Sequence, residues 1–150
     1  MQSKKSFDLR CQSDIEEGSK EFVQTLEPKN DKAVTVALSG DLGAGKTTFT
    51  KECARIIGVK ENVASPTYVL MRIYDIDFKG FKKYIHIDAY RLKGKEELLN
   101  LGWDDLIKNP EHLIFIEWPE MVFGAIPNDA INLSFLHGDD ENHRIFSRQI

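Results

Sequence analysis

The stretch Ala33-Val-Thr-Val-Ala-Leu-Ser-Gly-Asp-Leu-Gly-Ala-Gly-Lys-Thr47 decides the fold. Its first six residues are apolar or β-branched without alternation, which predicts a strand that is covered on both faces. A glycine-rich loop follows, and we expect a helix from Lys46 to Ile57 that ends at Gly58. A buried strand, a glycine-rich loop and a helix in this order predict an α/β domain with parallel central strands.

Residues 40–47 match the pattern G-x-x-x-x-G-K-[ST] of a phosphate-binding loop, or P-loop. Glycines let successive backbone N–H groups converge on one point, and the helix that follows adds a partial positive charge. Lys46 can place its ammonium between the β- and γ-phosphates, and the Thr47 hydroxyl can bind Mg²⁺. A glycine-rich turn with an incidental lysine is the alternative. The nucleotide contacts are expected at Asp41, Leu42, Gly43, Ala44, Gly45, Lys46, Thr47 and Thr48.

A second metal-binding side chain is expected at the end of a neighbouring strand. Leu113-Ile-Phe-Ile-Glu117 is an apolar run that ends in an acid, which is the Walker B pattern. Glu117 is expected beside Thr47, where its carboxylate would hold Mg²⁺ directly or through a water. A solvated acid at a strand end is the alternative.

Residues 84–88 form another short apolar segment that ends in an acid. His86 and Asp88 are two residues apart, so their side chains point to the same face of a strand. Near a phosphate site they could orient or deprotonate a water, which makes Asp88 a candidate catalytic residue. A histidine that is hydrogen-bonded to the structure is the alternative for His86. Arg91 could reach a phosphate or pair with a nearby acid, and its spacing does not decide between the two.

Two further segments flank the expected site. Ser65, Pro66, Thr67 and Tyr68 follow the P-loop helix, where nucleotide switches place a hydroxyl that responds to the γ-phosphate. A turn set by the proline is the alternative. Trp118 comes at the mouth of the expected site and could close the pocket or contact a partner, although a lone tryptophan is more often a packing residue.

The remaining pattern predicts strands and helices that first alternate and then give way to hairpins. We expect a strand at 7–11, a helix that Ser13 caps and Pro28 closes, strands at 68–74 and 84–87, helices at 95–101 and 104–107, and a hairpin of 131–136 with 144–147. This order predicts one domain over residues 1–150 with three layers. Its sheet is expected to be mixed, with a parallel centre and antiparallel strands at its margins.

The composition excludes several classes of protein. Hydrophobic residues are 41% and charged residues 29% of the 150, which is the balance of a globular protein. The net charge of −4 argues against coating nucleic acid through bulk positive charge. No apolar run approaches the roughly 20 residues that span a bilayer, and we expect no secretory signal and no membrane contact. Cys11 and Cys53 are expected to be free thiols, which fits a cytoplasmic location.

Four motifs, in their order and approximate spacing, resemble the TsaE family, also called YjeE. The resemblance extends over nearly the whole chain. It implies a small P-loop ATPase of bacterial tRNA modification, which supports formation of threonylcarbamoyladenosine together with TsaD and its partner TsaB. The motifs are Gly40-Asp-Leu-Gly-Ala-Gly-Lys-Thr-Thr48, Ser65-Pro-Thr-Tyr68, His86-Ile-Asp-Ala-Tyr-Arg91 and Glu117-Trp-Pro119.

The resemblance also implies roles for single residues. It supports Lys46 and Thr47 as contacts to ATP or ADP and to Mg²⁺, and Glu117 as a ligand of the ion. It raises Asp88 to a catalytic or metal-network residue. It makes the Ser-Pro-Thr-Tyr segment a switch and Trp118 functional. Contact with tRNA would be indirect, through the complex of partner proteins.

Two rival functions remain open from the sequence. A small-molecule P-loop kinase shares the loop and the size, but such kinases usually carry an arginine-rich lid, and no arginine occurs between Glu96 and Arg144. A nucleotide-dependent adaptor that does not hydrolyse ATP is the second rival. Release of phosphate, measured with and without partner proteins, separates the three functions.

Overall fold

The computed structural model describes residues 4–9, 12–40, 45–60, 70–137 and 144–149. Among the described helices, none has the length and apolar character that crossing a membrane requires. The elements, in chain order, are β1 (Lys4–Leu9), α1 (Gln12–Gln24), β2 (Val34–Gly40), α2 (Lys46–Ile57), β3 (Met71–Phe78), β4 (Phe81–Asp88), α3 (Lys95–Asn100), α4 (Trp103–Ile107), β5 (His112–Glu117), the 3₁₀ helix η1 (Pro119–Val122), β6 (Ile131–His137) and β7 (Arg144–Gln149).

A seven-stranded sheet in the order β1-β7-β6-β2-β5-β4-β3 forms the middle layer. Its centre is parallel, because β2 pairs in parallel with β5 and β6, and β5 pairs in parallel with β4. Its margins are antiparallel, through the pairs β3–β4, β6–β7 and β1–β7. The predicted fold class is therefore confirmed, and the carboxyl ends of β2, β5 and β4 meet at one edge of the sheet, which we call the carboxyl edge.

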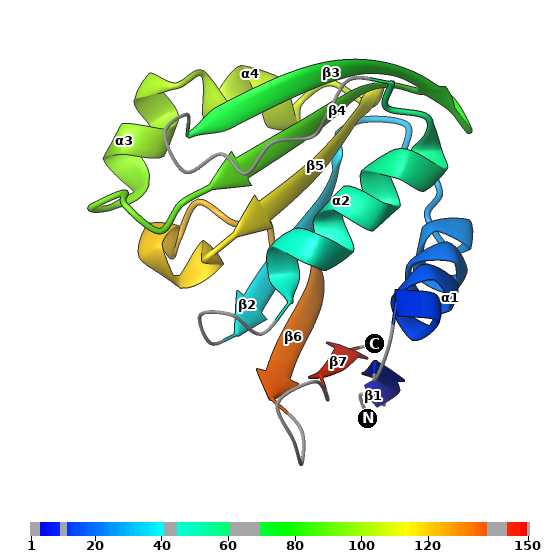
Figure 1. Ribbon diagram of the computed structural model, residues 1–150. Helices are drawn as coiled ribbons and strands as arrows, with labels where there is room; N and C mark the ends of the chain where they lie inside the picture. Colours follow the sequence, from blue (N-terminus) through cyan, green and yellow to red (C-terminus); the bar gives the residue numbers. More distant parts are fainter. Residues whose placement is uncertain (1–3, 10–11, 41–44, 61–69, 138–143, 150) are drawn as a thin grey trace.

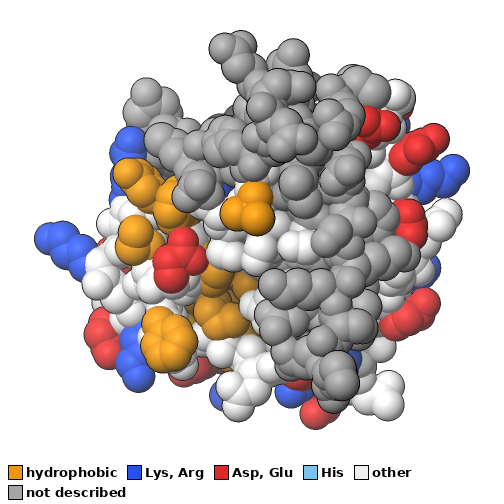
Figure 2. Space-filling view, turned by 90° about the horizontal axis from the view of Figure 1, so that it is seen from below, with side chains coloured by type: hydrophobic (Ala, Val, Ile, Leu, Met, Phe, Trp, Pro, Cys, Tyr) orange, Lys and Arg blue, Asp and Glu red, His pale blue; other side chains and the backbone are white. Residues whose placement is uncertain are grey.

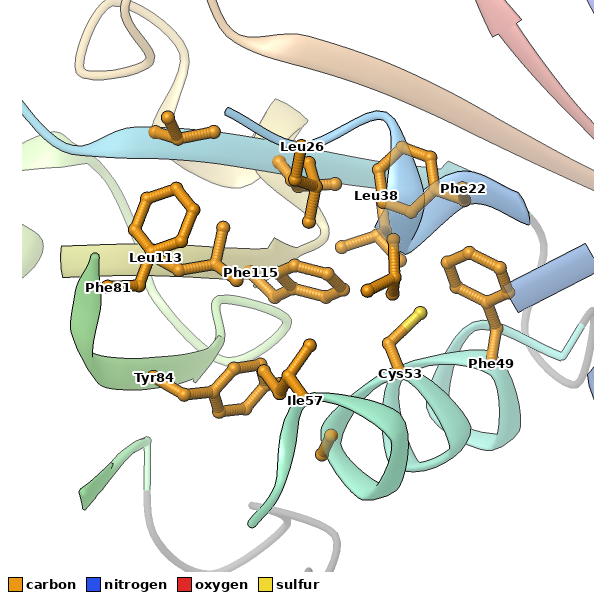
Figure 3. Close-up of a cluster of buried hydrophobic side chains, with 14 of the residues drawn as sticks. Phe22, Leu26, Leu38, Phe49, Cys53, Ile57, Phe81, Tyr84, Leu113 and Phe115 are labelled. Carbon is orange, nitrogen blue, oxygen red and sulfur yellow. The ribbon is translucent and has the colours of Figure 1, made fainter. Parts of the chain in front are cut away.

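Helices cover both faces of the sheet (Figure 1), and each face has its own hydrophobic core. On one face, Phe22 of α1 and Phe49 and Cys53 of α2 pack against side chains of the central strands, including Leu38 and Phe115 (Figure 3). On the other face, α3, α4 and η1 pack against the alternate side chains of the same strands. Both faces of β2 are covered, which explains why its sequence is a continuous apolar run.

Helix α2 begins and ends at the residues that the sequence predicts. Gly45 precedes it with φ 99°, and Gly58 ends it with φ 101°, a left-handed conformation that favours glycine. The Gly58 N–H donates to the carbonyls of Ala54 and Arg55. Glycines at both ends thus fix the length of the helix whose first residues are Lys46 and Thr47.

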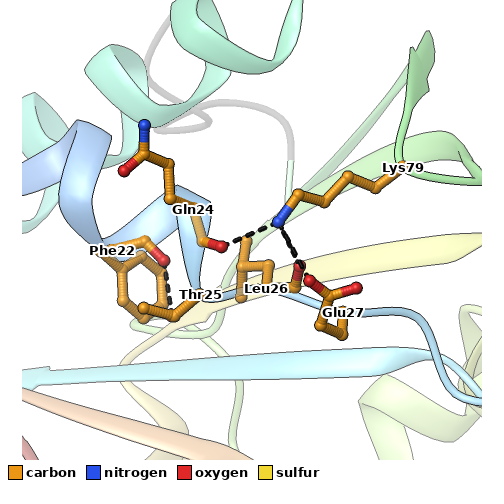
Figure 4. A network of polar contacts seen from close by, with 6 residues as sticks. All are labelled: Phe22, Gln24, Thr25, Leu26, Glu27 and Lys79. Carbon is orange, nitrogen blue, oxygen red and sulfur yellow. Dashed lines mark hydrogen bonds and ion pairs between the residues drawn. The ribbon is translucent and has the colours of Figure 1, made fainter.

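The β3–β4 hairpin joins its strands through Lys79 and Gly80, which both have positive φ as a tight hairpin turn requires. The Lys79 ammonium reaches the end of α1, where it donates to the carbonyls of Gln24 at 2.8 Å and Leu26 at 3.0 Å (Figure 4). It also pairs with Glu27 Oε1 at 3.2 Å. A cation at these carbonyls complements the negative end of the helix, so the hairpin stabilises the end of α1.

Some predictions need correction. Ser13 is not the N-cap of the first helix, because α1 already begins at Gln12. The strand expected at 68–74 runs from Met71 to Phe78, and the residues before Leu70 lie outside the described part of the chain. The short helix η1 was not predicted. Cys53 is a free, buried thiol as expected, and burial raises its pKa, whereas Cys11 lies outside the described residues.

Candidate functional site

The candidate site lies at the carboxyl edge, where β2 leads into the P-loop. Gly40, the last residue of β2, has φ 140°, and a Cβ on it would lie 2.3 Å from the Phe135 carbonyl oxygen of β6. Only glycine fits this close approach, so the first glycine of the motif also packs the sheet. The predicted contacts Asp41, Leu42, Gly43 and Ala44 lie outside the described residues.

Lys46 is 5% exposed, although its side chain carries a charge. Its ammonium donates to the Gly40 carbonyl and lies 3.7 Å from the centroid of the Trp118 ring. Both contacts neutralise part of the cost of burying the ammonium, the second through the negative face of the indole. The lysine is therefore held at the mouth of the loop by contacts that a phosphate group can replace.

Thr47, Glu117 and His86 form a chain of hydrogen bonds between α2, β5 and β4. The Thr47 hydroxyl donates to Glu117 Oε1 at 3.1 Å, and His86 Nε2 lies 2.6 Å from Glu117 Oε2. Glu117 is 3% exposed and His86 is fully buried. The structure therefore places Glu117 beside Thr47, where the sequence expects it, and of the two readings of His86 it favours a hydrogen-bonded histidine.

The geometry fits a hard divalent cation. A hydroxyl and a carboxylate side by side are oxygen donors of the kind that Mg²⁺ takes from a protein when phosphates and waters complete its shell. Within the described part of the chain, no group of three or more His, Cys, Asp or Glu side chains is arranged to hold a metal ion alone. An ion at Thr47 and Glu117 would thus depend on the nucleotide for its remaining ligands.

Asp88 ends β4 directly beside Glu117, its partner in the parallel register. Burial raises the pKa of the Asp88 carboxyl, and the nearby Glu117 carboxylate raises it further. The Tyr90 backbone N–H donates to Asp88 Oδ1 at 3.0 Å and lowers this pKa, as do His86 and Lys46, but burial has the largest effect. A half-buried carboxylate with a raised pKa is a better proton acceptor than a solvated one. The predicted catalytic role of Asp88 itself stays a prediction.

Trp118 and Tyr90 form an aromatic pair at the mouth of the site, with ring centroids 4.9 Å apart. The Trp118 backbone adopts a left-handed conformation, φ 60° and ψ 52°, and its N–H donates to the Leu38 carbonyl at 3.1 Å. This turn aims the indole back over Lys46. No role was predicted for Tyr90, although its position two residues after Asp88 indicates that it lies at the same edge.

The other predicted positions are placed as follows. Thr48 and Arg91 are exposed, and Ser65, Pro66, Thr67 and Tyr68 lie outside the described residues. Figure 2 views the molecule from below and shows hydrophobic side chains gathered on one part of this face, with charged side chains scattered around them. Tyr90, which follows β4, is 48% exposed, and Phe123, which follows η1, is 88% exposed.

The sequence is similar to that of known proteins over most of its length. Residues 11–149 match the sequence model of the family described as threonylcarbamoyl adenosine biosynthesis protein TsaE. The tRNA threonylcarbamoyladenosine biosynthesis protein TsaE of Haemophilus influenzae is 40% identical over 81% of this chain and 75% of its own length. The protein of the same name from Rickettsia typhi is 37% identical over 93% of this chain and 90% of its own length.

The fold has a counterpart among solved structures. The crystal structure of Bacillus subtilis YdiB superimposes with a TM-score of 0.75, covers 99% of this chain and 86% of its own, and is 21% identical. That likeness supports the P-loop fold alone, whereas the family match covers nearly the whole sequence and includes the residues of the carboxyl edge. The chain belongs to the TsaE family of tRNA threonylcarbamoyladenosine biosynthesis proteins.

Proposed function

We propose that this protein is a Mg²⁺-dependent ATPase that serves threonylcarbamoyladenosine modification of tRNA together with TsaD and TsaB. The observation that carries the proposal is the hydrogen bond between Thr47 and Glu117, which brings the P-loop hydroxyl and the Walker B carboxylate together. The family match supports the pathway, and the names of the relatives state it for those proteins.

Nucleotide binding in this site requires Lys46 to exchange partners. Its ammonium now contacts the Gly40 carbonyl and the Trp118 ring, and both are weaker partners than a phosphate oxygen. The amino end of α2 adds partial positive charge at the same place. Binding would therefore move the ammonium from the indole to the β- and γ-phosphates.

Thr47 and Glu117 would hold Mg²⁺, which supplies charge stabilisation for the transferring phosphoryl group. Asp88 lies beside Glu117 and would orient or deprotonate the attacking water. Trp118 and Tyr90 would shield the site from bulk solvent. Each of these residues positions a group or stabilises charge, which is the form that catalysis of phosphoryl transfer takes.

The protein alone is expected to be a slow ATPase. Arg91, the arginine nearest the site in sequence, is exposed in the structure. An arginine finger is worth about 10³–10⁵ in rate in other P-loop enzymes. The TsaB–TsaD pair would supply this charge or order the Ser-Pro-Thr-Tyr segment around the γ-phosphate. With a net charge of −4, the chain would leave most contact with tRNA to its partners.

The test is phosphate release from ATP by the purified protein, with and without Mg²⁺ and with and without TsaB–TsaD. We expect slow Mg²⁺-dependent release that rises when the partners are added. Glu117→Ala should lose the Mg²⁺-dependent release and keep some nucleotide binding, whereas Glu120→Ala removes an exposed acid and should leave the unassisted rate unchanged. Equal rates in Glu117→Ala and the parent would refute the metal site.

The rival functions give different results in the same assay. A small-molecule kinase would form ADP only when an acceptor is present and would release no phosphate. An adaptor that only switches shape would bind ATP without turnover, with or without the partners. A turnover curve that stays flat as TsaB–TsaD is added would contradict partner activation.

A further inference from the structure

Thr47, Glu117 and His86 are linked by hydrogen bonds, and the proposed reaction assigns a role to Thr47 and Glu117 but none to His86. It lies on β4, it is fully buried, and its Nε2 is 2.6 Å from Glu117 Oε2. Its other ring nitrogen, Nδ1, is also buried and has no hydrogen-bond partner among the described residues. Among the described residues, Glu117 is therefore the hydrogen-bond partner that the structure gives to this histidine.

The direction of this hydrogen bond follows from Glu117. An ionised carboxylate only accepts hydrogen bonds, and its Oε1 already accepts from Thr47. His86 Nε2 must then carry the hydrogen and donate it to Oε2. Nδ1 has no acceptor among the described residues, so a hydrogen there would be unpaired, and the tautomer with its hydrogen on Nε2 fits the geometry.

The imidazole ring is itself held by its neighbours. Tyr84, two residues earlier on the same face of β4, lies 6.4 Å from the His86 ring and 5.3 Å from the Phe115 ring, measured between centroids. Tyr84 and Phe115 are both fully buried. This packing leaves the histidine little freedom to rotate, so its donor stays aimed at Glu117.

We propose that His86 is a positioning residue for the metal ligand Glu117: it occupies Oε2 and thereby presents Oε1 to Thr47 and the ion. The inference rests on the proposed function, because it concerns the carboxylate that would hold Mg²⁺. Without the donor, Oε2 would be buried and unpaired, and the carboxylate would turn toward Thr47 to recover a hydrogen bond. Partners of this kind typically contribute 10–100-fold to metal affinity.

A role as general base does not fit the same observations. A base must reach the proton that it removes, directly or through one water. His86 is fully buried and its Nε2 is engaged by Glu117, whereas Asp88 is half-buried at the open end of the strand. On this face of β4, His86 is thus a buried positioning residue, whereas Asp88 is a carboxylate at the mouth of the site.

Three substitutions separate positioning from mere packing. His86→Gln places an amide N–H near the position of Nε2 and can still donate to Glu117. His86→Asn carries the same amide, but its shorter side chain reaches only as far as Nδ1. His86→Leu fills similar space and donates nothing. Each variant is first checked by thermal unfolding, and the Gln and Asn pair gives the comparison even if the Leu variant does not fold.

The measurement is the affinity for a fluorescent ADP analogue as a function of Mg²⁺ concentration and in excess chelator. We expect His86→Leu and His86→Asn to require about 10–100-fold more Mg²⁺ than the parent, and His86→Gln to require nearly as little as the parent. Affinity in chelator should be the same in all four proteins, since it reports the loop and Lys46.

The outcomes distinguish this inference from the proposed function. If the parent shows Mg²⁺-dependent binding and every variant shares its Mg²⁺ requirement, the positioning role is wrong and the proposed function stands. If His86→Gln loses as much as His86→Asn, the histidine acts through packing and the inference is again overturned. If binding by the parent ignores Mg²⁺, the proposed metal site fails and this inference fails with it.

Discussion

At the carboxyl edge of the parallel strands, Lys46 and Glu117 are 5% and 3% exposed. We call the opposite edge of the sheet, where β2 and β6 begin, the amino edge. There the side chains of Lys32 and Asp129 are 42% and 39% exposed. Both edges carry charges of opposite sign, but those at the carboxyl edge are far less exposed to water. Burying a charge costs free energy that an exposed pair does not incur, so the two edges differ in what their charges contribute.

We expect this difference to separate residues that bind a ligand from residues that add a little stability. At the carboxyl edge the contacts of the buried groups include a carbonyl and an indole for Lys46, and a hydroxyl and an imidazole for Glu117. At the amino edge, one carboxylate accepts from two ammonium groups in solvent. We therefore expect changes at the first edge to alter ligand binding and turnover, and changes at the second to alter stability slightly.

The largest effect is expected from Lys46→Ala. It removes the ammonium that would contact the phosphates, so nucleotide affinity and turnover should both be lost; the missing donor alone typically costs about 10²–10³ in rate, on top of the lost binding. The domain should still fold, because the change also removes the cost of burying an ammonium group. Nucleotide affinity, phosphate release and thermal unfolding are measured together.

The matched control for this change is Lys51→Ala, which removes an exposed lysine from the same helix. It should leave affinity and turnover at the level of the parent. Equal affinity and turnover in Lys46→Ala and Lys51→Ala would show that the carboxyl edge does not bind phosphate, and the comparison between the edges would lose its functional meaning.

Asp88→Asn should lower turnover and raise stability. Burial raises the pKa of Asp88 above its ordinary value, so protonation favours the folded state. The stability that this proton provides is complete below the ordinary pKa of 3.8 and is lost as the pH rises through the higher folded value. At pH 7 the ionised carboxylate destabilises the fold, and asparagine removes that cost.

Denaturant unfolding of Asp88→Asn, measured without Mg²⁺ or nucleotide, should give a higher free energy of unfolding than the parent at pH 7, with a difference that shrinks toward pH 3. Loss of a general base typically costs about 10²–10⁴ in rate. Asp104→Asn, at an exposed position of α4, is the control for loss of an acid. A variant that is both less stable and fully active would place Asp88 among ordinary surface carboxylates.

The central stretch was the most predictable part of the fold. The bounds of α2 follow from glycines on both sides, and β2 follows from its unbroken apolar run. These are local signals, in which backbone freedom and side-chain burial act within a few residues. Ser13 shows the limit of local signals. It is a good capping residue, but the helix already begins at Gln12, the residue before it.

The candidate site was predictable as a set of residues but not as a set of contacts. Thr47 and Glu117 were expected side by side from a known relation between two motifs. The contact of His86 with Glu117 depends on β4 lying next to β5 in the sheet, and strand order is set by the whole domain. The contact of Lys46 with Trp118 depends on a left-handed backbone conformation at Trp118, which no local pattern announces.

The smallest effect is expected at the amino edge, from Asp129→Asn. Asp129 Oδ2 accepts from Lys29 at 2.5 Å and from Lys32 at 2.7 Å, and these two ammonium groups lower its pKa to about 2. A lowered pKa means that the ionised carboxylate stabilises the fold. This contribution is complete above the ordinary value of 3.8 and is lost as the pH falls through about 2.

The side chain of Asp129 is 39% exposed, so solvent screening reduces its contribution to about 1 kcal/mol or less. Urea unfolding of Asp129→Asn should show a small loss of unfolding free energy at pH 7 and a smaller loss at pH 3. The loss at pH 7 should also shrink in about 1 M salt, where the Debye length is near 3 Å. Asp31→Asn removes an exposed acid from the turn before β2 and is the matched control. Nucleotide affinity should stay at the level of the parent in both variants. A loss of several kcal/mol, or a loss of nucleotide binding, would mean that the amino edge carries charges as consequential as those of the carboxyl edge, and burial would then not be what distinguishes the two.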